Sequence, residues 1–142
     1  MSNKIKIGVF GVRRGLDYIK VLSKIDEAEV IAICDNDEEK VQTALKYCPA
    51  GVKVCADYNE LIDSGICAVI LCNNFNEHVP FAIQAMRKGI HVLSECIPAA
   101  TLKECAQLVD TVEETGCTYA FAENYPYFNT CKFITTCCWF CK

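Results

Sequence analysis

The segment IKIGVFGVRRGL, residues 5–16, decides the fold of this chain. Its first six residues are mostly β-branched or aromatic, which predicts a buried strand. Apolar residues with helical spacing follow, and they predict a helix over residues 15–25. A strand that enters a glycine-containing turn and leaves it as a helix is the first half of a βαβ unit.

The same alternation continues along the rest of the chain. Short apolar runs predict strands over residues 30–34, 53–55, 68–72, 91–95 and 117–122, and amphipathic stretches predict helices over residues 38–47, 59–64, 77–88 and 101–114. Uninterrupted apolar strands between helices are typical of a parallel sheet that is covered on both faces. We therefore predict an α/β fold, a Rossmann-type doubly wound parallel sheet in a single domain. The domain is expected to span residues 1–124, followed by an apolar, cysteine-rich tail over residues 125–142.

The composition limits the function classes. The chain has 142 residues, 52% of them hydrophobic, and a net charge of −4, which fit one globular domain. No stripe of lysine and arginine marks a nucleic-acid surface, and no apolar run approaches the roughly 20 residues that span a membrane. The first predicted strand begins almost at once, without the pattern of a signal peptide. We expect a cytoplasmic protein with no nucleic-acid or membrane partner.

Twelve cysteines suggest a disulfide framework, but their positions argue against one. Cys34, Cys67, Cys72 and Cys117 lie in or beside apolar strand-like runs, where cytosolic cysteines act as small buried hydrophobes. The tail holds one C-x-x-C pair, residues 138–141, whereas a zinc site needs two such pairs or two further ligands at fixed spacing. We therefore expect reduced thiols and no metal site, with a thiol-based redox or metal protein as the weaker alternative.

The glycine-containing turn is an imperfect dinucleotide motif. In G-x-G-x-x-G the first glycine makes the turn, the second admits the pyrophosphate, and the third lets helix and strand pack closely. Gly11 takes the first position, while Arg13 occupies the second and Leu16 the third. Gly15 stands one position early. The motif alone is weak, but the strand before it and the helix after it are in the required places.

Asp35 ends the second predicted strand, 24 positions after Gly11. A carboxylate there can accept hydrogen bonds from the ribose hydroxyls of a dinucleotide and would repel a 2′-phosphate, so it favours NAD. Arg13 and Arg14 leave NADP possible, because guanidinium groups bind phosphate. The alternatives are that Asp35 only caps a helix and that both arginines lie in a solvated turn. Ligands of such folds bind beyond the carboxyl ends of the strands, so the cofactor-binding candidates are Gly11, Arg13, Arg14, Asp35, Asn73, Asn74, His78, Glu95 and Asn124.

Residues 78–95 read HVPFAIQAMRKGIHVLSE. With this segment the chain resembles, over about residues 4–127, the N-terminal domain of the glucose–fructose oxidoreductase / inositol dehydrogenase / MocA family of NAD(P)-dependent oxidoreductases. The family's spacing is kept by His78, Ala85, Gly89, His91, Val92 and Glu95. The resemblance implies a nucleotide-binding domain of an enzyme that transfers hydride between a nicotinamide and a sugar-like or cyclitol hydroxyl.

Two departures from the family pattern bear on activity. The loop Thr-Pro-Asn-x-x-His is replaced by residues 73–78, NNFNEH, and Glu-Lys-Pro becomes Glu95-Cys96-Ile97. The resemblance places that lysine beside the nicotinamide and the substrate hydroxyl, and a thiol supplies neither its charge nor its donors. A second catalytic group belongs to a C-terminal domain that this chain is expected to lack. We therefore assign no catalytic residue and expect a truncated domain that binds the dinucleotide but is catalytically incomplete alone.

The alternative is a non-enzymatic nucleotide-binding or structural remnant that dimerises. Arg13 supports it, since a side chain at the second glycine position can block the pyrophosphate. The tail carries the apolar residues Phe133, Ile134, Trp139 and Phe140. An exposed apolar patch of that size predicts a homo-oligomer formed through the tail or a sheet edge.

Overall fold

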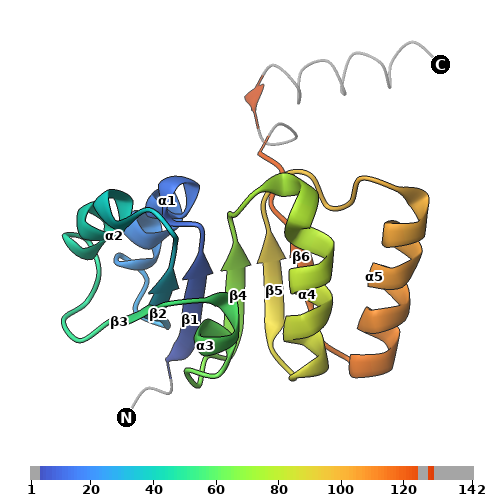
Figure 1. Ribbon diagram of the computed structural model, residues 1–142, viewed down its shortest axis with the longest axis horizontal. Coiled ribbons are helices and arrows are strands. Elements are labelled where there is room, and N and C mark those ends of the chain that lie inside the picture. The colour runs from blue at the N-terminus through green and yellow to red at the C-terminus, as the bar shows by residue number, and fades with distance from the viewer. Residues whose placement is uncertain (1–3, 125–127, 130–142) are drawn as a thin grey trace.

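Six parallel strands form one sheet in the order β3-β2-β1-β4-β5-β6 (Figure 1). The computed structural model describes residues 4–124 and 128–129. The strands are β1 (Ile5–Phe10), β2 (Ala28–Cys34), β3 (Lys53–Cys55), β4 (Ala68–Leu71), β5 (His91–Ser94) and β6 (Tyr119–Phe121). The chain builds outward from β1 to β3 and then crosses to β4 and builds the other way. This reversal confirms the predicted doubly wound α/β fold and puts the switch point between β1 and β4.

Helices cover both faces of the sheet (Figure 1). They are α1 (Val12–Leu22), α2 (Glu38–Leu45), α3 (Tyr58–Ile62), α4 (His78–Arg87) and α5 (Leu102–Thr115), with one 3-10 turn, η1 (Phe75–Glu77). The helices α1 and α2 pack on one face, and α3, α4 and α5 pack on the other, so each face has its own apolar core. Burial on both faces explains why the strands read as continuous apolar runs.

The register of the central strands places like residues in rows. Val9 of β1 pairs with Ile33 of β2 and with Ile70 of β4. Register partners in neighbouring parallel strands point to the same face, so these three buried side chains form one row beneath α1 and α2. This row fixes the relative height of the strands whose carboxyl ends meet at the switch point.

The predicted boundaries needed correction chiefly at α1. The helix begins at Val12, three residues before the predicted start, and the bond from Gly15 N to Gly11 O (3.0 Å) closes its first turn. Strand β2 begins at Ala28, two residues earlier than predicted, and β6 is shorter than predicted at both ends. Helix α5 begins with a capping box, in which Thr101 and Glu104 each bind the other's backbone N–H.

The cysteines and the tail complete the comparison with the predictions. All eight described cysteines are free, and Cys34, Cys72 and Cys117 are buried as predicted, whereas Cys67 is exposed in the loop before β4. Within residues 4–124 and 128–129, no three His, Cys, Asp or Glu side chains are placed to hold a metal ion. No helix among these residues is long and apolar enough to cross a membrane. The predicted self-association through the tail falls almost entirely outside the described residues.

Candidate functional site

A cavity of about 630 Å³ opens at the carboxyl edge of the sheet, at the switch point. Its walls come from the ends of β1 and β2, the first turn of α1, the segment after β3 with the start of α3, the loop after β4, and the first turn of α4. The residues that line it are Phe10, Gly11, Arg13, Cys34, Asp35, Asn36, Ala56, Asp57, Tyr58, Asn59, Cys72, Asn73, Asn74, Glu77 and Phe81. This is the place where open α/β sheets bind their ligands.

Gly11 brings three strand ends together. Its φ is +88°, and a Cβ there would lie 2.5 Å from backbone atoms of both Cys72 and Asn73. Its N–H donates to Cys34 O at 2.9 Å. Only a residue without a side chain can sit so close to the loop after β4. Gly11 therefore does what the first glycine of a dinucleotide motif does.

Gly15 takes the role of the third glycine, although it stands one position early. A Cβ on Gly15 would lie 2.4 Å from Val9 Cγ1, so α1 approaches β1 closely because this residue is a glycine. The turn of this chain is therefore G-x-x-x-G, one residue shorter than the usual motif. By spacing alone the third position falls on Leu16, but the helix starts directly after Gly11 and the close contact with β1 is made by Gly15.

Asp35 links the end of β2 to the start of α1. Its Oδ2 accepts from Val12 N at 2.8 Å, and its Oδ1 accepts from Asp37 N at 3.0 Å. The carboxylate therefore caps α1 from a distant part of the chain, and it also lines the cavity. Each oxygen keeps a second lone pair, so the cap leaves room for hydroxyl donors from a ligand.

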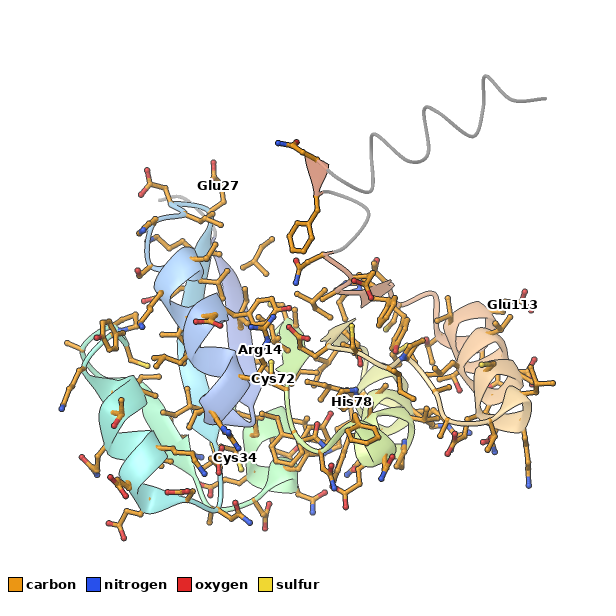
Figure 2. The ribbon with its side chains drawn as sticks, turned by 90° about the horizontal axis from the view of Figure 1, so that it is seen from above. Arg14, Glu27, Cys34, Cys72, His78 and Glu113 are labelled. Atoms are coloured by element: carbon orange, nitrogen blue, oxygen red, sulfur yellow. The ribbon has the colours of Figure 1, made fainter. Side chains whose placement is uncertain are left out.

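The two adjacent arginines point to different places. Arg13 lines the cavity. Arg14 is not among its described lining residues; it lies on the side of α1 near Cys72, as Figure 2 shows looking onto the carboxyl edge of the sheet. There its Nε donates to Glu95 Oε1 at 2.9 Å. The structure thus places Arg14 and Glu95 against each other rather than on the cavity wall.

Glu95 is a nearly buried carboxylate with three donors around it. Its side chain is 12% exposed, and besides Arg14 it accepts from Tyr18 Oη at 2.6 Å and from Cys96 N at 3.4 Å. Burial, followed by the hydrogen bond to Glu95, raises the pKa of Tyr18. Tyr18 therefore stays a protonated donor, and the cluster joins α1 to the end of β5.

Asn73 and Asn74 line the cavity from the loop after β4. Asn73 Nδ2 donates to Asn74 O at 3.3 Å. Asn73 Oδ1 is buried and has no hydrogen-bond partner in the described part of the chain. An unsatisfied buried acceptor costs about 1–3 kcal/mol, so this oxygen is suited to a donor that a ligand brings.

Two other candidates, His78 and Asn124, lie outside the described lining of the cavity, as does Cys96 at the family's lysine position. His78 is only 1% exposed and lies beneath the loops at the start of α4 (Figure 2). Asn124 is exposed and follows β6, two strands away from β4. Cys96 lies near the end of β6, with its Sγ 3.4 Å from Glu123 Oε2. Burial and the hydrogen bond to Glu123 raise the pKa of Cys96, so its neutral thiol is favoured.

Sequence reasoning missed an aromatic wall of the cavity. Phe10, Tyr58 and Phe81 pack with ring centroids 4.6–4.9 Å apart, and all three line the cavity. Tyr58 Oη donates to Phe81 O at 2.7 Å, which ties α3 to α4. These residues lie on three separate elements, and no short spacing in the sequence connects them.

The arrangement defines a nucleotide-binding domain of the Rossmann class. A family model described as "Oxidoreductase family, NAD-binding Rossmann fold" (GFO_IDH_MocA) matches residues 5–123. The chain belongs to this family. The match confirms the resemblance seen in the sequence, and with it the predicted cofactor class, NAD.

Curated relatives are much longer than this chain. A glycosyl hydrolase family 109 protein of Shewanella pealeana is 31% identical over 133 residues, which cover 87% of this chain and 29% of that protein. An alpha-N-acetylgalactosaminidase of Shewanella oneidensis is 31% identical over 134 residues, with the same two shares. The chain therefore spans less than a third of the length of these relatives.

Solved structures share the fold. The WlbA dehydrogenase from Bordetella pertussis, in complex with NADH and UDP-GlcNAcA, superposes with a TM-score of 0.83 and 24% identity over 94% of this chain and 41% of that one. The scyllo-inositol dehydrogenase from Lactobacillus casei, with bound NAD(H) and scyllo-inositol, gives a TM-score of 0.81 and 20% identity over 94% and 40%.

Proposed function

We propose that the cavity at the switch point binds NAD, and that this chain is the cofactor-binding part of an oxidoreductase acting on sugar-like or cyclitol hydroxyls. The observation that carries the proposal is the meeting of Asp35, Gly11 and the amino end of α1 at one cavity wall. This wall combines a carboxylate for hydroxyls with a helix end that attracts phosphate.

The residues present fit the cofactor. Gly11 leaves room beside the first turn of α1, where a pyrophosphate would meet backbone amides and the Arg13 side chain. Asp35 is held ready to accept from ribose hydroxyls. Asn73 Oδ1 is buried and unpaired among the described residues, so it can accept a hydrogen bond from the cofactor. The aromatic wall offers ring faces and edges against which a flat base can pack.

The charges around the cavity favour NAD over NADP. Asp35, Asp57 and Glu77 line it, and Arg13 is the only lysine or arginine in its described lining. An added 2′-phosphate beside Asp35 would be repelled, and Arg13 is needed for the pyrophosphate. We therefore expect a lower affinity for NADP than for NAD. Any NADP binding that remains would depend on Arg13.

Bound NAD supplies a hydride acceptor or donor at its nicotinamide. The chain's own residues hold and orient it, and we assign no proton transfer to them. The position that the family fills with lysine is Cys96, whose Sγ lies 3.4 Å from Glu123 Oε2 and which is not among the described lining residues of the cavity. We expect the chain by itself to bind the cofactor without turning over a substrate.

The substrate class rests on the relatives. They include a protein named alpha-N-acetylgalactosaminidase, and fold neighbours hold UDP-GlcNAcA or scyllo-inositol. The sugar in that relative's name and the two ligands are all ring compounds with several hydroxyls.

Arg13 supports a second candidate function, a nucleotide-binding or structural remnant without enzymatic activity. Its side chain stands at the position where the usual glycine admits the pyrophosphate. Association into homo-oligomers is a separate proposal, which is compatible with either function.

Isothermal titration with NAD⁺, NADH, NADP⁺ and NADPH tests the proposal. Wild-type protein should bind NAD(H) more tightly than NADP(H), and Asp35→Asn should weaken NAD(H) binding at least about tenfold. Asp110→Ala, an exposed carboxylate on α5, is the matched control and should bind as wild type does. If the folded wild-type protein binds neither dinucleotide, the proposal fails and the structural reading replaces it.

A further inference from the structure

Two loops at the carboxyl edge of the sheet meet on one imidazole. His78, the first residue of α4, has its Nε2 3.3 Å from Asn73 O in the loop after β4. Its Nδ1 lies 3.2 Å from Ile97 O in the loop after β5. The ring is 1% exposed, so it contacts both loops from the inside of the protein and is not a free side chain in the cavity.

The two loops carry different parts of the candidate site. The loop after β4 contributes Asn73 and Asn74 to the cavity wall. The loop after β5 carries Cys96, which stands at the family's lysine position. The His78 ring has a nitrogen within hydrogen-bond distance of a backbone carbonyl in each loop. A change in its position would therefore alter the cavity wall and the Cys96 loop together.

The hydrogen bonds around the ring form one connected set. A neutral imidazole has a single N–H, and both carbonyl oxygens can only accept. A neutral ring therefore donates to one of the two carbonyls at a time. Ser94 Oγ lies 3.1 Å from His78 Nδ1 and 3.2 Å from Glu95 O, so its hydroxyl can donate to Nδ1 when Nε2 carries the proton and to Glu95 O when Nδ1 carries it. Ser94 is fully buried, and buried polar groups of this kind are costly to leave unpaired. The ring therefore cannot be replaced by an apolar side chain without freeing a carbonyl.

We propose that His78 is a positioning residue, which holds the loop that lines the cavity at a fixed distance from the loop that carries Cys96. This assignment differs from the expectation that His78 contacts the cofactor. The proposal rests on the proposed function in one respect, namely that the cavity whose wall His78 supports is an NAD site. The link between the two loops can be measured without any cofactor.

The test uses three variants of the whole chain and one control. His78→Ala removes both contacts. His78→Asn places an amide nitrogen near the position of Nδ1 and keeps the contact to Ile97, while His78→Gln reaches the position of Nε2 and keeps the contact to Asn73. His91→Ala is the matched control, because His91 is exposed and bonds Thr118 N at the amino edge of the sheet (2.9 Å).

Two quantities are measured for each variant. The first is the rate at which iodoacetamide alkylates Cys96 in the folded protein, measured by mass spectrometry relative to the exposed thiols Cys67 and Cys105. The second is the dissociation constant for NADH. His78→Ala should change the relative Cys96 rate at least threefold and weaken NADH binding at least tenfold. His78→Asn should restore the Cys96 rate more than the affinity, and His78→Gln should do the reverse.

Several results would overturn the proposal. One is a His78→Ala protein that loses thermal stability but matches His91→Ala in both readouts. If His78→Ala does not fold, the two amide variants decide, and equal effects of Asn and Gln on both readouts reject the link. If wild-type protein binds no NADH, the proposed function fails, while the Cys96 rates still accept or reject the role of His78.

Discussion

Arg14 and Glu95 lie 81 positions apart in the sequence, and their side chains meet at 2.9 Å. The pair joins the first turn of α1, at the cavity, to the end of β5, next to Cys96. Tyr18 donates to the same carboxylate oxygen. The cluster therefore fixes the helix that would face the pyrophosphate against the strand that leads to the family's lysine position.

Replacing Glu95 by glutamine should destabilise the fold by about 1 kcal/mol, since the ion pair to half-exposed Arg14 is lost while an acceptor for Tyr18 remains. Urea denaturation measures the change. Asp17→Asn is the control, because it removes only the more exposed contact of Arg14 with its helix neighbour. Equal losses in the two variants would show that the Glu95 cluster contributes no more than a surface pair.

Gly15→Ala should destabilise the protein by about 1–3 kcal/mol, because the new Cβ would lie 2.4 Å from Val9 Cγ1 and force α1 away from β1. In an open helix the same change would stabilise by up to about 1 kcal/mol, so the sign of the effect is diagnostic. Val21→Ala, at an exposed site on the same helix, should be nearly neutral. A stabilised Gly15→Ala protein would contradict the close packing.

Stability should fall as the pH rises above 9. Burial, with the nearby Glu95 charge, raises the pKa of Cys72 from 9.0 to about 12. Between these values the unfolded thiol has lost its proton and the folded one has kept it, so the loss reaches about 1.4 kcal/mol per pH unit for one such group. Unfolding free energies at pH 8, 9.5 and 10.5 should show a flatter slope in Cys72→Ala.

The control for this pH series is Cys105→Ala, which removes an exposed thiol. It should keep the slope of the wild-type protein. The slope of Cys72→Ala will not vanish, because burial also raises the pKa of Cys34 to about 11. Identical slopes in all three proteins would refute the assignment to Cys72.

Arg13→Ala should weaken NAD binding at least about tenfold, since hydrogen bonds to charged groups contribute about 1.5–3 kcal/mol. The titration should be repeated at higher salt, where the difference from wild type should shrink. Arg87→Ala, an exposed residue of α4, is the control. Tighter binding by Arg13→Ala would show that the side chain obstructs the pyrophosphate and would favour the reading as a remnant.

The parts of the site that could be predicted are those encoded locally. Gly11 and Asp35 follow directly from strand ends, and the order of strands and helices fixes the edge on which they meet. The exact start of α1 could not be predicted, because its cap comes from Asp35, more than twenty residues away. Starting at Val12 also separates Arg13 from Arg14, since successive helical residues differ by about 100° around the axis.

Other parts depended on contacts between distant segments. Tyr58 and Phe81 meet only after α3 and α4 pack on the same face of the sheet. His78 was expected to face the cofactor because it opens a helix just after the carboxyl end of a strand. In the structure its ring is buried between two loops and lies against a backbone carbonyl of each. The positions of backbone carbonyls in loops cannot be predicted from a sequence.

The double use of Asp35 has a consequence for how such chains change over evolutionary time. Its carboxylate accepts from Val12 N and Asp37 N and so caps α1, a role in the fold that is enough by itself to retain it. A descendant that abandoned the dinucleotide would still lose a helix cap by mutating this residue. Asp35 would then be retained for its role in the fold. Substitutions at Arg13 or Asn73 would appear earlier in a lineage that no longer binds the dinucleotide.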